Sequence, residues 1–143
     1  MKEKYETLAT IVVDTASEIG INVEAQNILS SSDQDTRQLS KFVVATCEEL
    51  LTRFPWKRKL GDDPWVKDSN GDFKDSLEYD DDIPLIDSRL LKLGTRWRYL
   101  HSKGFNYAED FRAYELRRSS FAYDFNKDRP VDLLNEPVKG IML

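Results

Sequence analysis

Apolar side chains recur at helical spacing in the first part of the chain. The positions that share one face are Leu8, Ile11, Val12, Thr15, Ala16 and Ile19. They predict a helix from about Tyr5 to Ile19, because residues three and four apart lie on the same side of a helix and Gly20 follows as a C-terminal stop. A connector with a cluster of serines comes next.

A broader apolar stripe predicts the second helix. It is formed by Leu39, Phe42, Val43, Thr46, Cys47, Leu50, Leu51 and Phe54. Ser32 is the expected N-cap, because its hydroxyl can accept a hydrogen bond from a free N–H of the first turn. Pro55 ends the helix, since its ring prevents the next turn.

The helical period disappears between Trp56 and Asp82. The pair Asn70-Gly71 predicts a hairpin with a two-residue type I′ turn, because both residues tolerate positive φ. Since the flanking residues are polar, we expect a small exposed hairpin and not a sheet with its own core.

The helical period returns after Asp82 and continues, with one short break, to about Phe125. Pro84 suits the first turn of a third helix, Asp81 or Asp82 its N-cap, and Gly104 the position after its end. Its apolar rhythm consists of Ile86, Leu90, Leu93, Trp97 and Leu100.

A fourth helix follows the break, with Asn106 and Glu109 at capping-box spacing. Its aromatic seam consists of Tyr107, Phe111, Tyr114, Phe121 and Phe125. Helices joined by so short a loop are expected to be antiparallel.

These patterns predict a mainly α protein with one domain. We expect an antiparallel bundle of about four helices over residues 1–126, with a small β-hairpin or loop insertion at about residues 56–82. Residues 127–143 contain two prolines and a glycine without a sustained period, and are expected to form an extended C-terminal tail.

Composition narrows the class of protein further. A single cysteine excludes an internal disulfide framework. No apolar run is long enough to span a bilayer, and the N-terminal residues lack the apolar region of a signal peptide, so we expect a soluble protein made in a cytoplasm, with no membrane partner.

Charge is unevenly distributed along the chain. The formal net charge of -5 disfavours general affinity for nucleic acid. Residues 61–82 hold nine acidic residues and two lysines, whereas residues 89–103 hold five basic residues and no acid. A chain polarised in this way can associate with a complementary copy or partner.

Few residues are candidates for metal binding or catalysis. The segment from Asp68 begins like a calcium-binding loop but has Phe73 where a glycine belongs and Tyr79 where a bidentate glutamate belongs. His101 is the only imidazole, and Cys47 lies on an apolar stripe, as a buried structural thiol does. We expect no catalytic, cofactor-binding or metal-ligating residues, and no enzyme.

Three basic residues of the third helix, Arg89, Arg96 and Lys103, are spaced by seven and lie together beside Trp97. One interpretation is a core helix whose charged flank pairs with acidic residues of neighbouring helices. The other is a basic strip that faces an acidic surface or DNA. The spacing alone leaves both open.

The order of three motifs resembles the head-to-tail adaptor (connector) proteins of tailed bacteriophages. The motifs are "LATIVVDTASEIGI", "DQDTRQLSKFVVATCEELLTRFPWK" and "LIDSRLLKLGTRWRYLHSKGFNYAEDFRAYE". The matching positions in the last motif are Gly94, Trp97, Arg98, Gly104, Tyr107, Phe111, Tyr114 and Glu115. The resemblance covers about residues 7–120. It departs in the middle, where larger relatives often carry an extended β-rich insertion and this chain has about 27 residues.

The resemblance implies a structural virion protein without catalysis. Such adaptors form a ring, commonly of twelve copies, under the portal protein and join the DNA-filled head to a tail or neck protein on the opposite side. Double-stranded DNA passes through their channel without specific binding. The implied location is the head–tail neck of the virion, after synthesis in the host bacterial cytoplasm.

Two contacts are expected on this basis. The first joins copies of the chain, the basic residues Arg89, Arg96 and Lys103 facing Asp80, Asp81 and Asp82. The second docks the C-terminal tail on the portal through its apolar residues, Val131, Leu133, Leu134, Val138, Ile141, Met142 and Leu143.

Two other functions are open. The main alternative is a small helical nucleic-acid-binding or packaging-associated regulatory protein that places Arg89, Arg96 and Lys103 on phosphates. The other is a metal-dependent hydrolase that uses Asp80 to Asp82.

Overall fold

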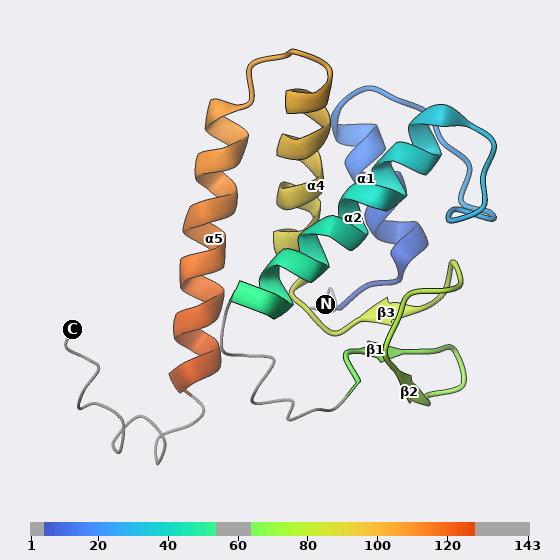
Figure 1. Ribbon diagram of the computed structural model, residues 1–143, viewed down its shortest axis with the longest axis vertical. Coiled ribbons are helices and arrows are strands. Elements are labelled where there is room, and N and C mark those ends of the chain that lie inside the picture. Colours follow the sequence, from blue (N-terminus) through green and yellow to red (C-terminus); the bar gives the residue numbers. More distant parts are fainter. Residues whose placement is uncertain (1–4, 54–63, 128–143) are drawn as a thin grey trace.

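The computed structural model describes residues 5–53 and 64–127, with residues 53 and 121–127 described as backbone only. The protein is mainly helical, as predicted, with a small three-stranded antiparallel sheet. The helices are α1 (Leu8–Glu18), α2 (Gln34–Arg53), α4 (Ser88–Ser102) and α5 (Ala108–Lys127), and the strands lie between α2 and α4 (Figure 1).

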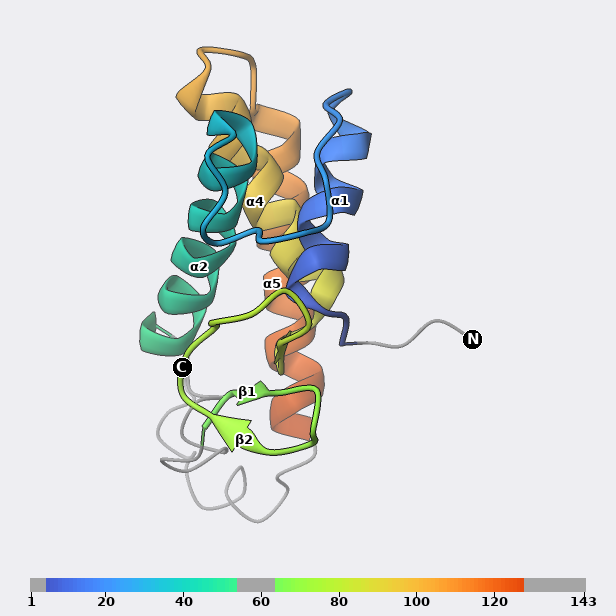
Figure 2. The same cartoon turned by 90° about the vertical axis from the view of Figure 1, so that its right-hand side faces the viewer.

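Helix α4 is the centre of the helical part. It contacts α1, α2 and α5, and seen from the side it lies between α1 and α2 (Figure 2). Six consecutive residues, Leu90 to Thr95, are buried, which is unusual for an amphipathic helix. Helix α4 therefore contributes core residues on several sides, and α5 packs against it along the molecule's edge (Figure 1).

The first two helices begin later than the sequence predicted. Thr7 is the N-cap of α1, accepting a hydrogen bond from Thr10 N–H at 3.1 Å. The predicted N-cap of α2, Ser32, is wrong by one residue. Asp33 takes this role, because its carboxylate reaches both the N–H and the hydroxyl of Thr36, at 2.9 and 2.8 Å.

The sheet contains one more strand than the predicted hairpin. Strand β1 (Val66–Lys67) pairs with both β2 (Phe73–Lys74) and β3 (Ile83–Pro84), in the order β2-β1-β3. Strand β3 was predicted as the start of a helix. Pro84 fits an edge strand, because it lies where no ladder N–H is needed.

The predicted type I′ turn at Asn70-Gly71 is wrong. Of the two residues only Gly71 has a positive φ, at +88°. The Asp68 carboxylate accepts hydrogen bonds from the N–H groups of Asn70 and Asp72, both at 2.9 Å. Asp68 N–H donates to Asp72 C=O at 2.8 Å, so the loop has three residues and ends in a left-handed glycine.

The predicted start of the third helix is also wrong, whereas its end is confirmed. Neither Asp81 nor Asp82 caps α4. Asp87 does, accepting a hydrogen bond from Leu90 N–H at 3.0 Å, because the preceding residues are held in the sheet. Gly104 follows the C-cap with φ +78°, as its position predicted.

Helix α5 begins and ends close to the predicted positions. The Asn106 side chain accepts a hydrogen bond from Ala108 N–H at 3.1 Å just ahead of the helix. The backbone remains helical to Lys127, two residues beyond the predicted end. The predicted tail beyond Lys127, with all seven of its proposed docking residues, lies outside the described residues.

Candidate functional site

Two of the three basic residues predicted to contact another copy have acidic partners within the chain. Arg89 Nη1 lies 3.0 Å from a carboxylate oxygen of Glu18 on α1. Arg96 lies 3.4 Å from Glu18 through Nη1 and 2.6 Å from Asp110 on α5 through Nε. The first interpretation, a charged flank that pairs with neighbouring helices, is therefore confirmed for these two residues. Lys103 instead lies over the Tyr99 ring, with Nζ 5.3 Å from its centroid.

Lys92 is the most buried cation of α4. Its Nζ lies 2.8 Å from Glu6 and 2.9 Å from Asp14, and its side chain is only 8% exposed. Burial alone lowers the pKa of Lys92, but the two carboxylates outweigh burial and raise it above the ordinary lysine value. Lys92 therefore stays charged inside the helical part and ties α4 to α1.

Arg98 links three helices through a shared carboxylate. Its guanidinium lies 2.6 Å from Glu49 and 2.9 Å from the Thr46 hydroxyl, both on α2. Tyr114 of α5 donates to the same Glu49 oxygen at 2.9 Å. Burial, and next the charge of Glu49, raise the pKa of the Tyr114 hydroxyl. The guanidinium also lies 4.7 Å from the Trp97 ring centroid.

The predicted acidic partners have different roles from one another. Asp80 accepts hydrogen bonds from the N–H groups of Asn27 and Ile28, at 2.6 and 2.8 Å, and so holds the loop before α2. Asp82 is fully buried and forms an ion pair with Lys74 at 2.8 Å. Asp81 is exposed.

Asp82 is held as a carboxylate by its surroundings. Burial alone raises its pKa, but the Lys74 ammonium and the N–H groups of Glu78 and Tyr79 outweigh burial and hold the pKa below the ordinary value. Both Asp80 and Asp82 also accept hydrogen bonds through their C=O groups from the first turn of α1. Their oxygens thus stabilise the fold.

The six predicted contact residues are not gathered into one surface. The acidic residues lie beside the start of α1 and the sheet, whereas Lys103 follows the opposite end of α4 (Figure 1). Asp81 and Lys103 are exposed without an ion-pair partner in the described part of the chain, and the rest of the set contacts other residues of the same chain.

Two observations concern the residues that were considered for metal binding and nucleophilic chemistry. Over residues 5–53 and 64–127, no group of three or more His, Cys, Asp or Glu side chains is placed to hold a metal ion. Cys47 is buried in the core, where burial raises the pKa of its thiol. A protonated buried thiol is a poor nucleophile.

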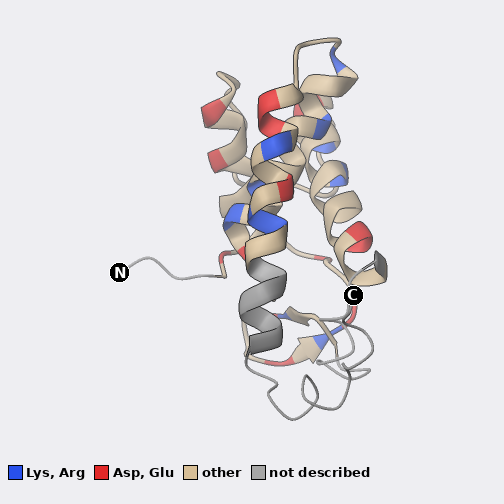
Figure 3. Cartoon of the chain, turned by 90° about the vertical axis from the view of Figure 1, so that its left-hand side faces the viewer, with Lys and Arg blue, Asp and Glu red and all other residues tan. Residues whose placement is uncertain are grey.

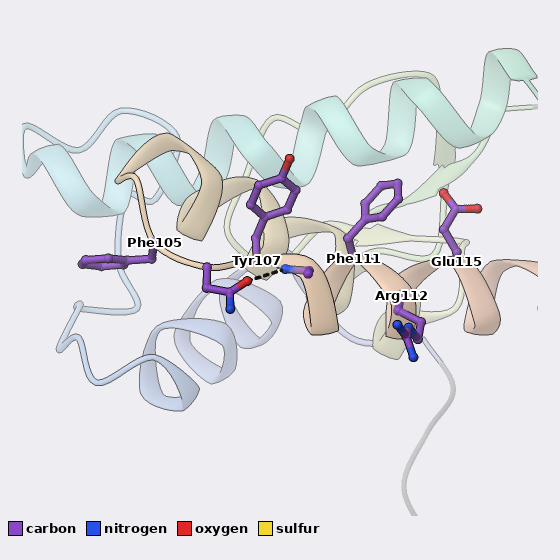
Figure 4. A pocket seen from close by; sticks show the side chains of 7 residues that line it. Phe105, Tyr107, Phe111, Arg112 and Glu115 are labelled. Atoms are coloured by element: carbon purple, nitrogen blue, oxygen red, sulfur yellow. Dashed lines mark hydrogen bonds between the residues drawn. The ribbon is translucent and has the colours of Figure 1, made fainter.

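An open depression lies where α4 turns into α5, and sequence reasoning missed it. Its volume is about 650 Å³, and it is lined by Phe105, Asn106, Tyr107, Ala108, Phe111, Arg112 and Glu115 (Figure 4). Trp97 supports it from α4, with ring centroids 4.9 Å from Phe111 and 5.8 Å from Tyr107. We call it the loop depression. The feature of the sequence that could have indicated this depression is Phe105, a large apolar residue in the break between two helices.

Charged residues alternate along the exposed side of α5 (Figure 3). Most have partners: Asp110 pairs with Arg96, and Arg118 with Glu115 at 2.6 Å. Arg117 pairs with Asp87 at 2.7 Å. Among the described side chains of α5, Glu109 and Arg112 have no ion-pair partner, and Arg112 extends from the helix on the side opposite Tyr107 and Phe111 (Figure 4).

Two large apolar residues are exposed on the sheet and in the turn that follows β2. The side chains of Phe73 and Tyr79 are 60% and 65% exposed, and Lys74 Nζ lies 4.7 Å from the Tyr79 ring centroid. The same segment carries four exposed acidic residues, Asp72, Asp75, Glu78 and Asp81. We call this set the sheet surface.

No helix in the described part of the chain is long and apolar enough to cross a membrane. Comparison of the chain with protein-family models, with curated proteins and with solved structures found no match. The resemblance to adaptor proteins therefore remains a prediction from the sequence motifs.

Proposed function

We propose that this chain is a structural virion protein, a head-to-tail adaptor that forms a ring under a portal protein and continues the DNA channel toward the tail. In this proposal the four helices form the antiparallel bundle of that family. The protein acts by binding copies of itself, the portal and a tail or neck protein, without catalysis.

One observation carries the proposal. The residues on which the resemblance depends lie far apart in the motif but pack together in the structure. A Cβ atom on Gly94 would lie 2.9 Å from the Tyr114 ring, so α4 and α5 approach closely where both motif residues stand. Trp97 packs edge-to-face on Phe111, and Arg98 and Tyr114 share Glu49. The motif residues thus pack against one another in a helical hairpin, and they are not arranged to bind a ligand.

The chain's charge supports the same proposal against its main alternative. Phosphates would have to displace Glu18 and Asp110 before they reached Arg89 and Arg96. Because the acidic residues outnumber the basic ones across the chain, a channel that lets DNA slide without gripping it is the more consistent role.

The first test is the mass of the full chain, alone and mixed with a candidate portal protein, by light scattering with negative-stain imaging. We expect a ring, either of the free protein or on the portal. A variant that ends at residue 127 should keep its helical circular dichroism and lose portal binding, because the proposed docking residues lie at Val131 and beyond.

Two results would contradict the proposal. Undiminished portal binding by the shortened variant would remove the docking role of the tail. A full chain that ignores the portal but is retained on duplex DNA, with retention that falls steeply as salt is added, would favour the nucleic-acid-binding alternative.

A further inference from the structure

We infer that the sheet surface of one copy binds the loop depression of the next copy, and that this contact joins the subunits of the proposed ring. The inference rests on the proposed function and replaces the predicted contact between the basic side of α4 and Asp80 to Asp82. That contact is disfavoured because most of those charges have partners within the chain.

The exposed apolar side chains support this pairing. Across the described residues, the large hydrophobic side chains that are exposed fall into two groups. Phe73 and Tyr79 belong to the sheet surface, whereas Phe105 and Phe111 line the loop depression and Leu116 follows on α5. Exposed aromatic residues are favourable contact points for a partner, because burying them removes apolar area from water.

The shapes of the two surfaces suit the proposed contact. Phe73 on β2 and Tyr79 in the turn that follows it are exposed, and β2 is an edge strand with no neighbour on its outer side in the described chain. The loop depression is open, and its walls are the rings of Tyr107 and Phe111 (Figure 4). An inserted ring would extend the edge-to-face cluster that Trp97 and Phe111 already form.

The charges of the two surfaces are complementary too. The sheet surface carries four exposed acidic residues, of which Glu78 pairs with Lys74 at 2.9 Å. Among the residues that line the loop depression, Glu115 is the one acid and pairs with Arg118, whereas Arg112 is exposed with no acidic partner in the described part. Opposite potentials of this kind orient two copies and speed their association.

The positions of the two surfaces determine the kind of assembly. The α4–α5 loop and the sheet lie at opposite ends of the long axis in both views (Figures 1 and 2). One copy therefore cannot cover its own depression, and each copy offers one surface of each kind. Such a contact is heterologous, and successive copies close into a ring when their rotation allows it.

Two double variants test the contact. The sheet variant carries Phe73→Ser and Tyr79→Ser, and the depression variant carries Phe105→Ser and Arg112→Glu. All four residues are exposed, so far-UV circular dichroism should not change. Lys41→Glu, at an exposed position on α2, is the control for the charge reversal. Sedimentation velocity, with and without the portal, measures the mass of each.

We expect the full chain and the control to assemble beyond dimers and each double variant to associate at least about tenfold more weakly. An equimolar mixture of the two variants should form a complex of two subunits and stop there, because only one intact pair of surfaces remains. Assembly of either variant like the full chain overturns the inference. So does a mixture that associates no better than each variant alone, or a full chain that stays monomeric in every condition.

The same experiment separates this inference from the proposed function. Rings on the portal that both double variants still form would leave the adaptor proposal intact and remove the contact. A complex of the two variants without any portal binding by the full chain would keep the contact and remove the adaptor proposal.

Discussion

Helices α4 and α5 differ in how their composition relates to their exposure. Helix α4 is the most basic stretch of the chain, yet its cations face acidic residues of α1, α2 and α5 and its middle is buried. Helix α5 and the loop before it are rich in large apolar residues, yet Phe105, Phe111 and Leu116 are exposed. Charge in a sequence therefore indicates a surface only when no neighbouring element supplies the opposite charge.

The physical reason is the number of neighbours. Helix α4 contacts three helices, so carboxylates reach it from several directions, whereas α5 lies at the edge and packs on α4 (Figure 1). Pairing of a buried cation is obligatory, since an isolated charge removed from water costs several kcal/mol. An exposed arginine such as Arg112 needs no partner.

The largest expected effect on stability comes from a comparison of two cations, Lys92 of α4 and Arg112 of α5. Lys92→Met should lower the free energy of unfolding by about 3 kcal/mol, because Glu6 stays largely buried without its ion pair to Lys92. Arg112→Met should change it by less than about 0.5 kcal/mol, because the residue is exposed. Urea denaturation of both variants measures the difference. Similar losses for the two would show that α4 is no better packed than α5.

The next effect tests the close approach of α4 to its neighbours. Gly94→Ala places a methyl group 2.5 Å from Thr46 Cγ2, so we expect a net loss of about 2 kcal/mol, although alanine favours a helix over glycine by about 1 kcal/mol. Adding Thr46→Ala removes one of the clashing side chains and should reduce the cost of the Gly94 change. The comparison is a double-mutant cycle by thermal or urea unfolding.

A matched control is Gly104→Ala. Nothing lies within 4 Å of its added methyl group, but its φ of +78° costs an L-residue about 1 kcal/mol. The loss of stability caused by Gly104→Ala should be the same with and without Thr46→Ala. A Gly94 change that stabilises the protein would contradict the packing described at α4.

A third effect is the dependence of stability on pH, which two buried side chains, Cys47 and Tyr114, are expected to produce. Burial raises the pKa of Cys47, so the folded state keeps a proton that the unfolded chain releases above about pH 8.5. The contribution of the thiol to the free energy of unfolding is fully present below that pH. Above it, the contribution falls by about 1.4 kcal/mol for each unit by which the pH rises. Burial and Glu49 raise the pKa of Tyr114, which adds the same effect above about pH 10.

Urea denaturation between about pH 7 and 10 measures this loss, with Cys47→Ala as the comparison. The variant should show a flatter dependence below about pH 10, because the thiol contribution is gone and that of Tyr114 begins only there. An unchanged slope would assign the loss to other groups.

The smallest effect tests the charged flank of α4. Glu18→Gln removes the carboxylate shared by Arg89 and Arg96 and should lower the free energy of unfolding by at most about 1 kcal/mol, since these pairs are partly exposed. The loss should shrink in about 1 M salt, where the Debye length is about 3 Å. A loss that persists at high salt would place the pairs in a drier site than the structure shows.

The sequence by itself determined the helical segments and the stops at Gly20 and Gly104. These depend on local rules: apolar spacing of three and four, and a glycine that accepts positive φ, as both do at +82° and +78°. Helix starts were less accurate, because several polar residues compete to cap one turn. Asp33 caps α2 in place of the predicted Ser32, and Asp87 caps α4 in place of Asp82.

Only the tertiary structure decided strand β3, the partners of the basic residues and the loop depression. Strand β3 exists because it pairs with β1, sixteen or more residues earlier in the chain, and two residues carry no period of their own. The roles of Asp80 and Arg96 depend on which backbone and which helix lie beside them. Spacing along one element fixes which side chains share a face, but whether that face meets another element or water depends on contacts between distant segments.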